Sequence, residues 1–208
     1  MRTLTKELQE KITPSLAVEL LKEGNKRFVS NLKINRNLLQ QVNDTTESQH
    51  PFAVIISCMD SRTSAELVFD QGLGDIFSIR IAGNVINEDI LGSTEFGCQV
   101  IGAKVVLVLG HTSCGAIKGA VDDVQLGHLH FITHKIQRCI PQLKQKSFTS
   151  EPDDLIKALT LENILQGIRD LRTSSTILSK MEHEAQIKII GGLYDISTGQ
   201  VNFIENYR

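Results

Sequence analysis

The sequence contains short apolar runs, each the length of one β-strand, separated by segments with helical patterns. Phe52–Ser57 and Lys104–Gly110 are almost entirely apolar, and Ile76–Ile81 and Gln186–Leu193 are further candidate strands. Strands that are apolar along their whole length are buried on both faces, which is typical of parallel sheets covered by helices. The pattern therefore predicts an α/β fold with a mainly parallel central sheet flanked by helices.

The two ends of the chain have their own patterns. Pro14–Phe28 is a predicted helix with one apolar side, whereas Asn31–Ser48 is polar, has no strong period and is predicted to be an extended arm or loop. Gly199–Glu205 is expected to pair with the last strand as a hairpin. Further helices are predicted at residues 64–70, 90–101, 114–123, 128–143 and 154–171. We expect one domain over residues 1–208, with an N-terminal helical arm (1–48), an α/β core (49–208) and a C-terminal hairpin-like strand pair.

Length and charge exclude several classes of protein. A chain of 208 residues can bury one sizeable core, and its net charge of −2 gives no reason to expect nucleic acid or an anionic membrane as a partner. No segment approaches the ~20 consecutive apolar residues of a membrane span, and the N-terminus lacks the apolar centre of a signal peptide. We therefore expect a cytoplasmic protein whose thiols stay reduced, with Cys98 and Cys139 as buried free thiols.

Two polar segments follow directly after two of the apolar runs. Cys58-Met-Asp-Ser-Arg62 follows the first run, and His111-Thr-Ser-Cys114 follows the run that ends at residue 110. Ligands bind outside the carboxyl ends of strands in open α/β sheets, so the two loops can converge if these strands are neighbours. Two cysteines and one histidine leave the fourth position of a zinc ion open, which is the pattern of a catalytic site. The sequence predicts one Zn²⁺ held by Cys58, His111 and Cys114.

Asp60 and Arg62 lie beside the first cysteine and could control that fourth position. Asp60 could accept a hydrogen bond from a zinc-bound hydroxide and orient it, or it could bind zinc directly as a fourth ligand and close the site. A bidentate pair with Arg62 would hold Asp60 away from the metal. The plain alternative is a surface ion pair, which would contribute little.

Together these motifs resemble those of the β-class carbonic anhydrases. The resemblance also rests on Arg80-Ile-Ala-Gly-Asn84 and on Glu162-Asn163, and it covers nearly the whole chain. It implies a carbonate dehydratase that reversibly hydrates carbon dioxide to bicarbonate and a proton, with one Zn²⁺ per subunit, Asp60 orienting the hydroxide and Arg62 supporting Asp60.

The resemblance also implies a substrate pocket and an assembly. Gln49 would hydrogen-bond the substrate, Phe77 and Ala82 would supply apolar walls, and Gly115 would line the site. Phe77 would come from a dimer partner, because related enzymes are dimers or larger even-numbered oligomers. A homodimer or homotetramer is therefore expected, and the apolar side of Pro14–Phe28 is compatible with contact to a partner.

Three alternatives use the same residues differently. Hydrolysis of carbonyl sulfide or carbon disulfide would need the same ligands, so the motifs do not separate it from carbon dioxide hydration. A non-catalytic zinc or redox sensor would oxidise Cys58 and Cys114 when zinc leaves, but it would need no Asp60 and Arg62. A Cys–His thiol hydrolase would leave Cys58 unexplained.

Overall fold

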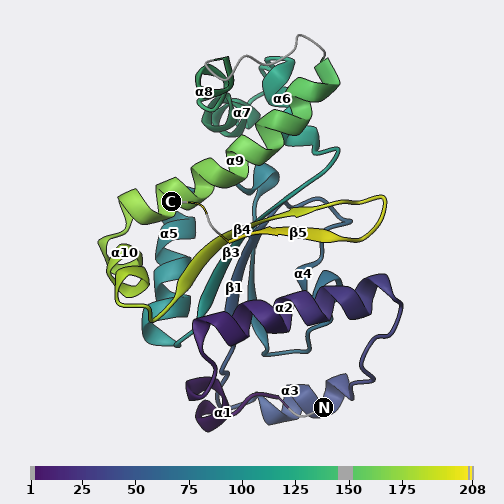
Figure 1. Cartoon of the computed structure of the whole chain (residues 1–208), viewed down its shortest axis with the longest axis vertical. Helices are drawn as coiled ribbons and strands as arrows, with labels where there is room; N and C mark the ends of the chain where they lie inside the picture. The colour runs from purple at the N-terminus through teal and green to yellow at the C-terminus, as the bar shows by residue number, and fades with distance from the viewer. Residues whose placement is uncertain (1–2, 145–151, 206, 208) are drawn as a thin grey trace.

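The computed structural model describes residues 3–144, 152–205 and 207, and one five-stranded sheet forms its centre (Figure 1). The strands are β1 (Ala53–Ser57), β2 (Ile76–Arg80), β3 (Val105–His111), β4 (Lys188–Tyr194) and β5 (Val201–Ile204). Their order is β2-β1-β3-β4-β5, and the first four are parallel, whereas β5 runs antiparallel to β4. The predicted α/β fold with a mainly parallel sheet and a terminal hairpin is confirmed.

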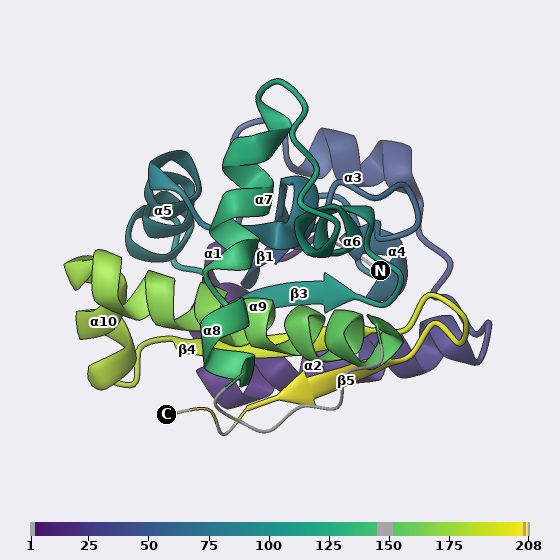
Figure 2. The same cartoon turned by 90° about the horizontal axis from the view of Figure 1, so that it is seen from above.

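Helices cover both faces of the sheet, as Figures 1 and 2 show. One face carries α2 (Pro14–Val29) and α4 (Ala65–Val68), and the other carries α5 (Glu88–Glu95), α9 (Pro152–Ser174) and α10 (Thr176–His183). Beyond the carboxyl ends of the strands lie α6 (Gly115–Val121), α7 (Leu129–Gln137) and α8 (Ile140–Lys144). The shorter elements are α1 (Lys6–Glu10), α3 (Leu38–Asp44), the 3₁₀ turn η1 (Ala82–Asn84) and the π-helical turn η2 (Phe96–Val100).

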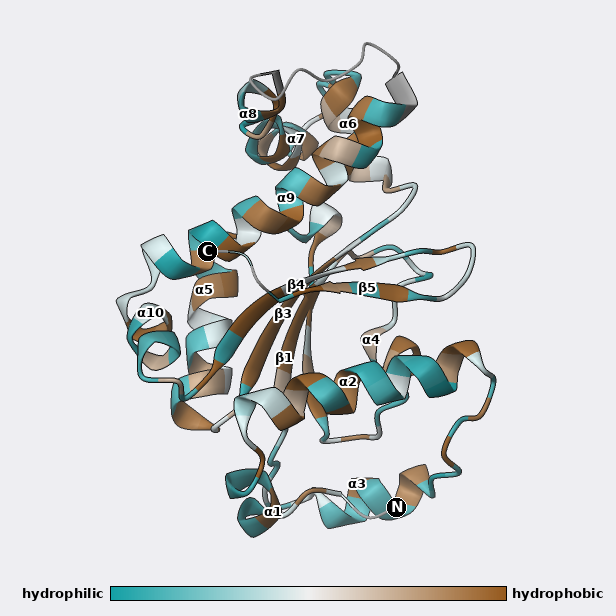
Figure 3. Ribbon diagram, viewed as in Figure 1, coloured by the Kyte–Doolittle hydropathy of each residue, from teal (hydrophilic) through white to brown (hydrophobic). Residues whose placement is uncertain are grey.

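The continuous apolar runs are explained by burial on both faces. Successive side chains of a strand point to opposite faces, so Ile55 and Leu107 face the α2 side, whereas Val54 and Val106 face the α9 side. All four are fully buried. Figure 3 accordingly shows hydrophobic residues along the central strands.

The apolar side of α2 covers the protein's own sheet. Ala17, Val18 and Leu21 are buried in the core on that face. At Gly24 the helix approaches the backbone so closely that an added Cβ would lie 1.8 Å from the carbonyl oxygen of Phe69. The predicted apolar stripe is therefore largely used within one chain.

The segment predicted as an extended arm or loop contains the helix α3. Asn37 caps it by accepting a hydrogen bond from the backbone N–H of Gln40, at 3.0 Å. Gln41 is its buried anchor, whose side-chain oxygen accepts from the N–H of Leu73, at 3.2 Å. The helix was missed because its apolar residues are exposed and its anchor is polar, so no apolar period points to the core.

A buried carboxylate attaches this arm to the core. Asp70, 3% exposed at its side chain, accepts from Arg27 at 2.6 Å and from Arg36 at 2.5 Å. It also accepts from the backbone N–H of Ile34, at 3.3 Å. Both ends of the segment before α3 are thus held by one side chain.

Other differences from the sequence-based expectations concern helix boundaries. The helix predicted at residues 128–143 is two helices, α7 and α8, and the helices α1 and α10 had no prediction. Cys98 and Cys139 are buried free thiols, as expected. Within the part of the chain that the structure describes, no helix combines the length and apolarity needed to cross a membrane.

Candidate metal centre

The pairing of β1 with β3 brings the two motif loops together. Ser57 and Leu109 are partners in this parallel pair, so Cys58 and His111 emerge at the same end of the sheet. The ligand atoms of Cys58, His111 and Cys114 lie within 4.8 Å of one another. The three residues are 4%, 1% and 2% exposed, respectively. Among the described residues, they are the only group of three or more Cys, His, Asp or Glu side chains arranged in this way.

The histidine presents a free lone pair to this group. His111 Nδ1 lies 2.9 Å from the carbonyl oxygen of Thr112, which can only accept, so Nδ1 carries the proton. The other ring nitrogen, Nε2, is buried without a hydrogen-bond partner. Such a group costs about 1–3 kcal/mol when it stays unsatisfied. A metal ion would satisfy it, and a backbone carbonyl on the opposite nitrogen is the usual support for a metal-binding histidine.

The two thiol groups lie within hydrogen-bond distance of each other. Their Sγ atoms are 3.9 Å apart, and the backbone N–H of Gly83 donates to Cys58 Sγ at 3.4 Å. The hydrogen bond from Cys114 lowers the pKa of Cys58, whereas proximity to the Cys58 thiolate raises the pKa of Cys114. A cation can replace the proton of this hydrogen bond, because metal binding requires both thiolates. Two thiolates and one imidazole suit zinc, which prefers four tetrahedral nitrogen and sulfur ligands.

Two side chains hold the loop after β1 by donating hydrogen bonds to its backbone carbonyl oxygens. The hydroxyl of Thr63 donates to the carbonyl oxygens of Cys58 and Asp60, both at 2.9 Å. Arg80 donates to the same two oxygens, at 3.3 and 2.5 Å. The loop conformation is therefore fixed from two directions before any metal binds.

Asp60 and Arg62 form the predicted bidentate pair. Nε of Arg62 lies 2.9 Å from Oδ1 and its Nη2 lies 2.7 Å from Oδ2, while its backbone N–H also donates to Oδ1 at 2.9 Å. These hydrogen bonds hold the pKa of Asp60 well below its usual range, so the group is a carboxylate at neutral pH. Asp60 is not part of the three-residue ligand group.

The four predicted substrate-pocket residues divide into two pairs. Ala82 precedes Gly83, which contacts Cys58, and Gly115 lines a hollow of about 470 Å³ together with Cys114. Gln49 is exposed in the segment before β1, whose opposite end carries the metal loop. Phe77 lies in the edge strand β2, where its strand partner is Val54 of β1. Within one chain, only Ala82 and Gly115 adjoin the metal centre.

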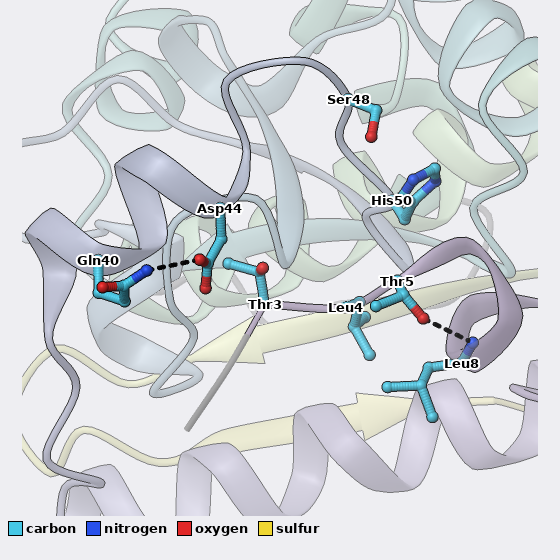
Figure 4. Close-up of a pocket in the computed structure, with 8 residues that line it drawn as sticks. All are labelled: Thr3, Leu4, Thr5, Leu8, Gln40, Asp44, Ser48 and His50. Atoms are coloured by element: carbon cyan, nitrogen blue, oxygen red, sulfur yellow. Dashed lines mark hydrogen bonds between the residues drawn. The ribbon is translucent and has the colours of Figure 1, made fainter.

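A larger hollow, of about 860 Å³, lies elsewhere, between the N-terminal segment and α3 (Figure 4). It is lined by Thr3, Leu4, Thr5, Leu8, Gln40, Asp44, Ser48 and His50. None of these belongs to the metal centre, and α1 and α3 lie at the opposite end of the molecule from α6 (Figure 1). The larger of the two hollows is therefore separate from the candidate metal centre.

Some residues that support the centre were not predicted as functional. Thr63, Arg80 and Asn163 act on backbone carbonyl groups of the loops around Cys58. Arg80 and Asn163 lie in motifs that carry the family resemblance, and this was the one signal in the sequence. The roles of all three follow from loop conformations that a sequence pattern does not show.

The chain thus combines an α/β fold with a buried Cys–His–Cys group at the carboxyl ends of parallel strands and an Asp–Arg pair beside it, an arrangement typical of α/β enzymes with a zinc centre. Residues 53–201 match the family model described as carbonic anhydrase. The chain therefore belongs to the carbonic anhydrase family, in its β class, as expected. It is a carbonate dehydratase, which is a lyase.

Individual relatives agree with this assignment. A carbonic anhydrase of Mycolicibacterium smegmatis is 33% identical over 193 residues, which cover 90% of this chain and 92% of the relative. The structure of the β-carbonic anhydrase CcaA has a TM-score of 0.70 and 27% identity, covering 89% of this chain and 94% of CcaA. One of the tetrameric β-carbonic anhydrases from Sordaria macrospora has the same fold, with a TM-score of 0.68, 20% identity and coverage of 76% and 82%.

Proposed function

We propose that this protein reversibly hydrates carbon dioxide to bicarbonate and a proton, with one zinc ion per chain held by Cys58, His111 and Cys114. The observation that carries the proposal is the buried ligand group, whose atoms lie within 4.8 Å of one another and include the unpartnered Nε2 of His111. Zinc with three protein ligands supplies water acidified to a pKa of about 7, which is a nucleophile near neutral pH. Two thiolates would place more negative charge on the zinc ion than three imidazoles would, and this would raise the pKa of the bound water. We therefore expect the activity to rise toward alkaline pH.

Asp60 orients the attacking water in this proposal. An ionised carboxylate only accepts hydrogen bonds, so Asp60 would receive an O–H and turn the oxygen lone pair toward the substrate carbon. Arg62 occupies both carboxylate oxygens, and this supports a site whose fourth position stays open. If Asp60 left Arg62, its carboxylate could become a fourth ligand and close the site. A zinc or redox sensor would need no such arrangement.

The remaining pocket residues would come from a second subunit. Phe77 lies on β2, which is an edge strand, and Phe96, which lines a surface hollow together with Phe77, is 50% exposed. Exposed apolar side chains next to an unpaired strand edge favour association with another chain. We propose a homodimer or homotetramer in which Gln49 and Phe77 complete the partner's site, in line with the tetrameric Sordaria relatives. Light scattering after gel filtration tests this, and a concentration-independent monomer would contradict it.

The test of the reaction compares two aspartate variants of the zinc-loaded protein. We expect Asp60→Asn to retain zinc but to hydrate carbon dioxide about 100-fold or more slowly. A side chain positioned to interact with a proton of the reacting group contributes at least about this factor to the rate. The matched control is Asp44→Asn, an exposed aspartate in the hollow of Figure 4, which should leave the rate unchanged. Stopped-flow measurement with a pH indicator gives the rate, and zinc content is measured on the same samples.

The same samples separate the alternatives. A zinc-loaded protein inert toward carbon dioxide at alkaline pH, but active on carbonyl sulfide or carbon disulfide, would replace the proposed substrate. A zinc-loaded protein inert toward all three would favour a sensor.

A further inference from the structure

The turn that contacts Cys58 has a demanding backbone conformation. Gly83, with φ +67°, and Asn84, with φ +45°, are two successive left-handed residues. The turn is attached to β1 by a hydrogen bond from the N–H of Ile81 to the carbonyl oxygen of Ser57, and it is closed by one from Asn84 to Ile81, each 3.0 Å. This conformation directs the Gly83 N–H at the Cys58 sulfur, 3.4 Å away.

A side chain from α9 holds the other side of the same glycine. Asn163, 5% exposed, donates from Nδ2 to the carbonyl oxygen of Gly83, at 2.8 Å. Its neighbour Glu162, 4% exposed at its side chain, binds Arg169, which lies about two turns further along the same helix, at 2.7 Å. The ion pair lies within α9, so it is the amide contact of Asn163 that joins this helix to the Gly83 turn.

We infer that Asn163 is a positioning residue of the metal centre, acting through Gly83 on Cys58. The inference rests on the proposed zinc site, although not on the identity of the substrate. An N–H donated to a thiolate stabilises negative charge on the sulfur and directs its remaining lone pairs. Partners of this kind contribute about 10- to 100-fold to metal affinity in other metalloproteins. The amide of Asn163 keeps the Gly83 peptide groups in place, so its removal weakens the N–H···S contact at the far side of the turn.

The test is the metal affinity and cobalt spectrum of Asn163→Leu, whose side chain has the same branched shape but no donor. We expect zinc affinity, measured by competition with a chromophoric chelator, to fall about 10- to 100-fold. In the cobalt-substituted protein the thiolate-to-metal charge-transfer band should move to longer wavelength, because an unshared sulfur lone pair is easier to oxidise. The matched control is Thr94→Val, since Thr94 is fully buried and bonds only within its own helix, to Ile90 at 2.7 Å. This control should leave both measurements unchanged.

A purely structural role for Asn163 would lower the thermal stability of Asn163→Leu without moving the cobalt band. If Asn163→Leu does not fold, Asn163→Ala takes its place, because it removes the donor without adding volume. In the wild-type protein loaded with a spin-active cadmium isotope, the Gly83 amide proton should also couple to the metal through Cys58. Unchanged zinc affinity and cobalt spectrum, or a Gly83 proton without that coupling, would overturn the inference. If the wild-type protein binds no zinc, the proposed function fails together with the inference. If the wild-type protein binds zinc and is active, but the Asn163 measurements give one of these results, only the role of Asn163 fails.

Discussion

Replacement of Gly83 by alanine tests how much strain the turn beside the metal centre can absorb. An L residue in the left-handed region costs about 1–2 kcal/mol, and Gly83 has φ +67°. The new methyl group would also lie 2.8 Å from Cδ1 of Ile136 and 3.2 Å from Cβ of Ala116. Overpacking of this kind costs about 1–3 kcal/mol. The sum is about 2–5 kcal/mol, which lowers the melting temperature of a domain this size by about 4–20 °C.

Natural domains are stable by about 5–15 kcal/mol, so we expect Gly83→Ala to fold but to bind zinc more weakly. Urea unfolding in the presence of a chelator gives the free energy of unfolding without the metal contribution. The comparison is Gly119→Ala in α6, where the nearest atom to the new methyl group lies 3.7 Å away. That change should be neutral or stabilising by about 0.5–1 kcal/mol. A Gly83→Ala protein within about 1 kcal/mol of the wild type would show that the turn relaxes freely, and it would refute the reasoning.

Two further predictions concern thiol reactivity and acid stability. After zinc is chelated, iodoacetamide should modify Cys58 first, because the hydrogen bond from Cys114 lowers the pKa of Cys58. Burial raises the pKa of Cys98 to about 12 and the pKa of Cys139 to about 11. Peptide mass spectrometry identifies the modified thiol, and a protein modified first at Cys98 would contradict this prediction. Burial opposes ionisation of Asp70, but two arginines outweigh it and hold its pKa below the usual value. Its stabilisation is complete above the unfolded-state pKa of about 3.9 and is lost as the pH falls through the lower folded-state pKa. Asp70→Asn should therefore cost about 3 kcal/mol at neutral pH and less in acid, and urea unfolding that gave the same difference at both pH values would be inconsistent with it.

The sequence predicted those features that depend on local pattern. Strands buried on both faces are visible as unbroken apolar runs, and the motif residues follow two of these runs directly, so the ligand group could be predicted on the condition that the strands are neighbours. The structure meets that condition, since β1 pairs with β3. The bidentate geometry of Asp60 and Arg62 also follows from their short spacing.

The remaining features depend on contacts that a sequence pattern does not encode. Asn163 and Gly83 are 80 residues apart and meet only because α9 crosses the carboxyl end of the sheet. Arg80 binds carbonyl oxygens, so its role depends on the conformation of a loop and not on the identity of a partner side chain. The helix α3 was missed because a polar residue, Gln41, is its buried anchor.

The pairing of β1 with β3 would also determine when the folding chain can bind the proposed zinc ion. The two cysteines of the candidate metal centre are 56 residues apart, and the parallel pairing of two non-consecutive strands brings them together. Pairing over such a separation is slow compared with helix formation, because the loop must close before the contact stabilises it. During refolding, helical signal should therefore return before zinc affinity does. Uptake of the proposed zinc ion would then be a late step of folding, because only molecules with a complete sheet hold both cysteines in place.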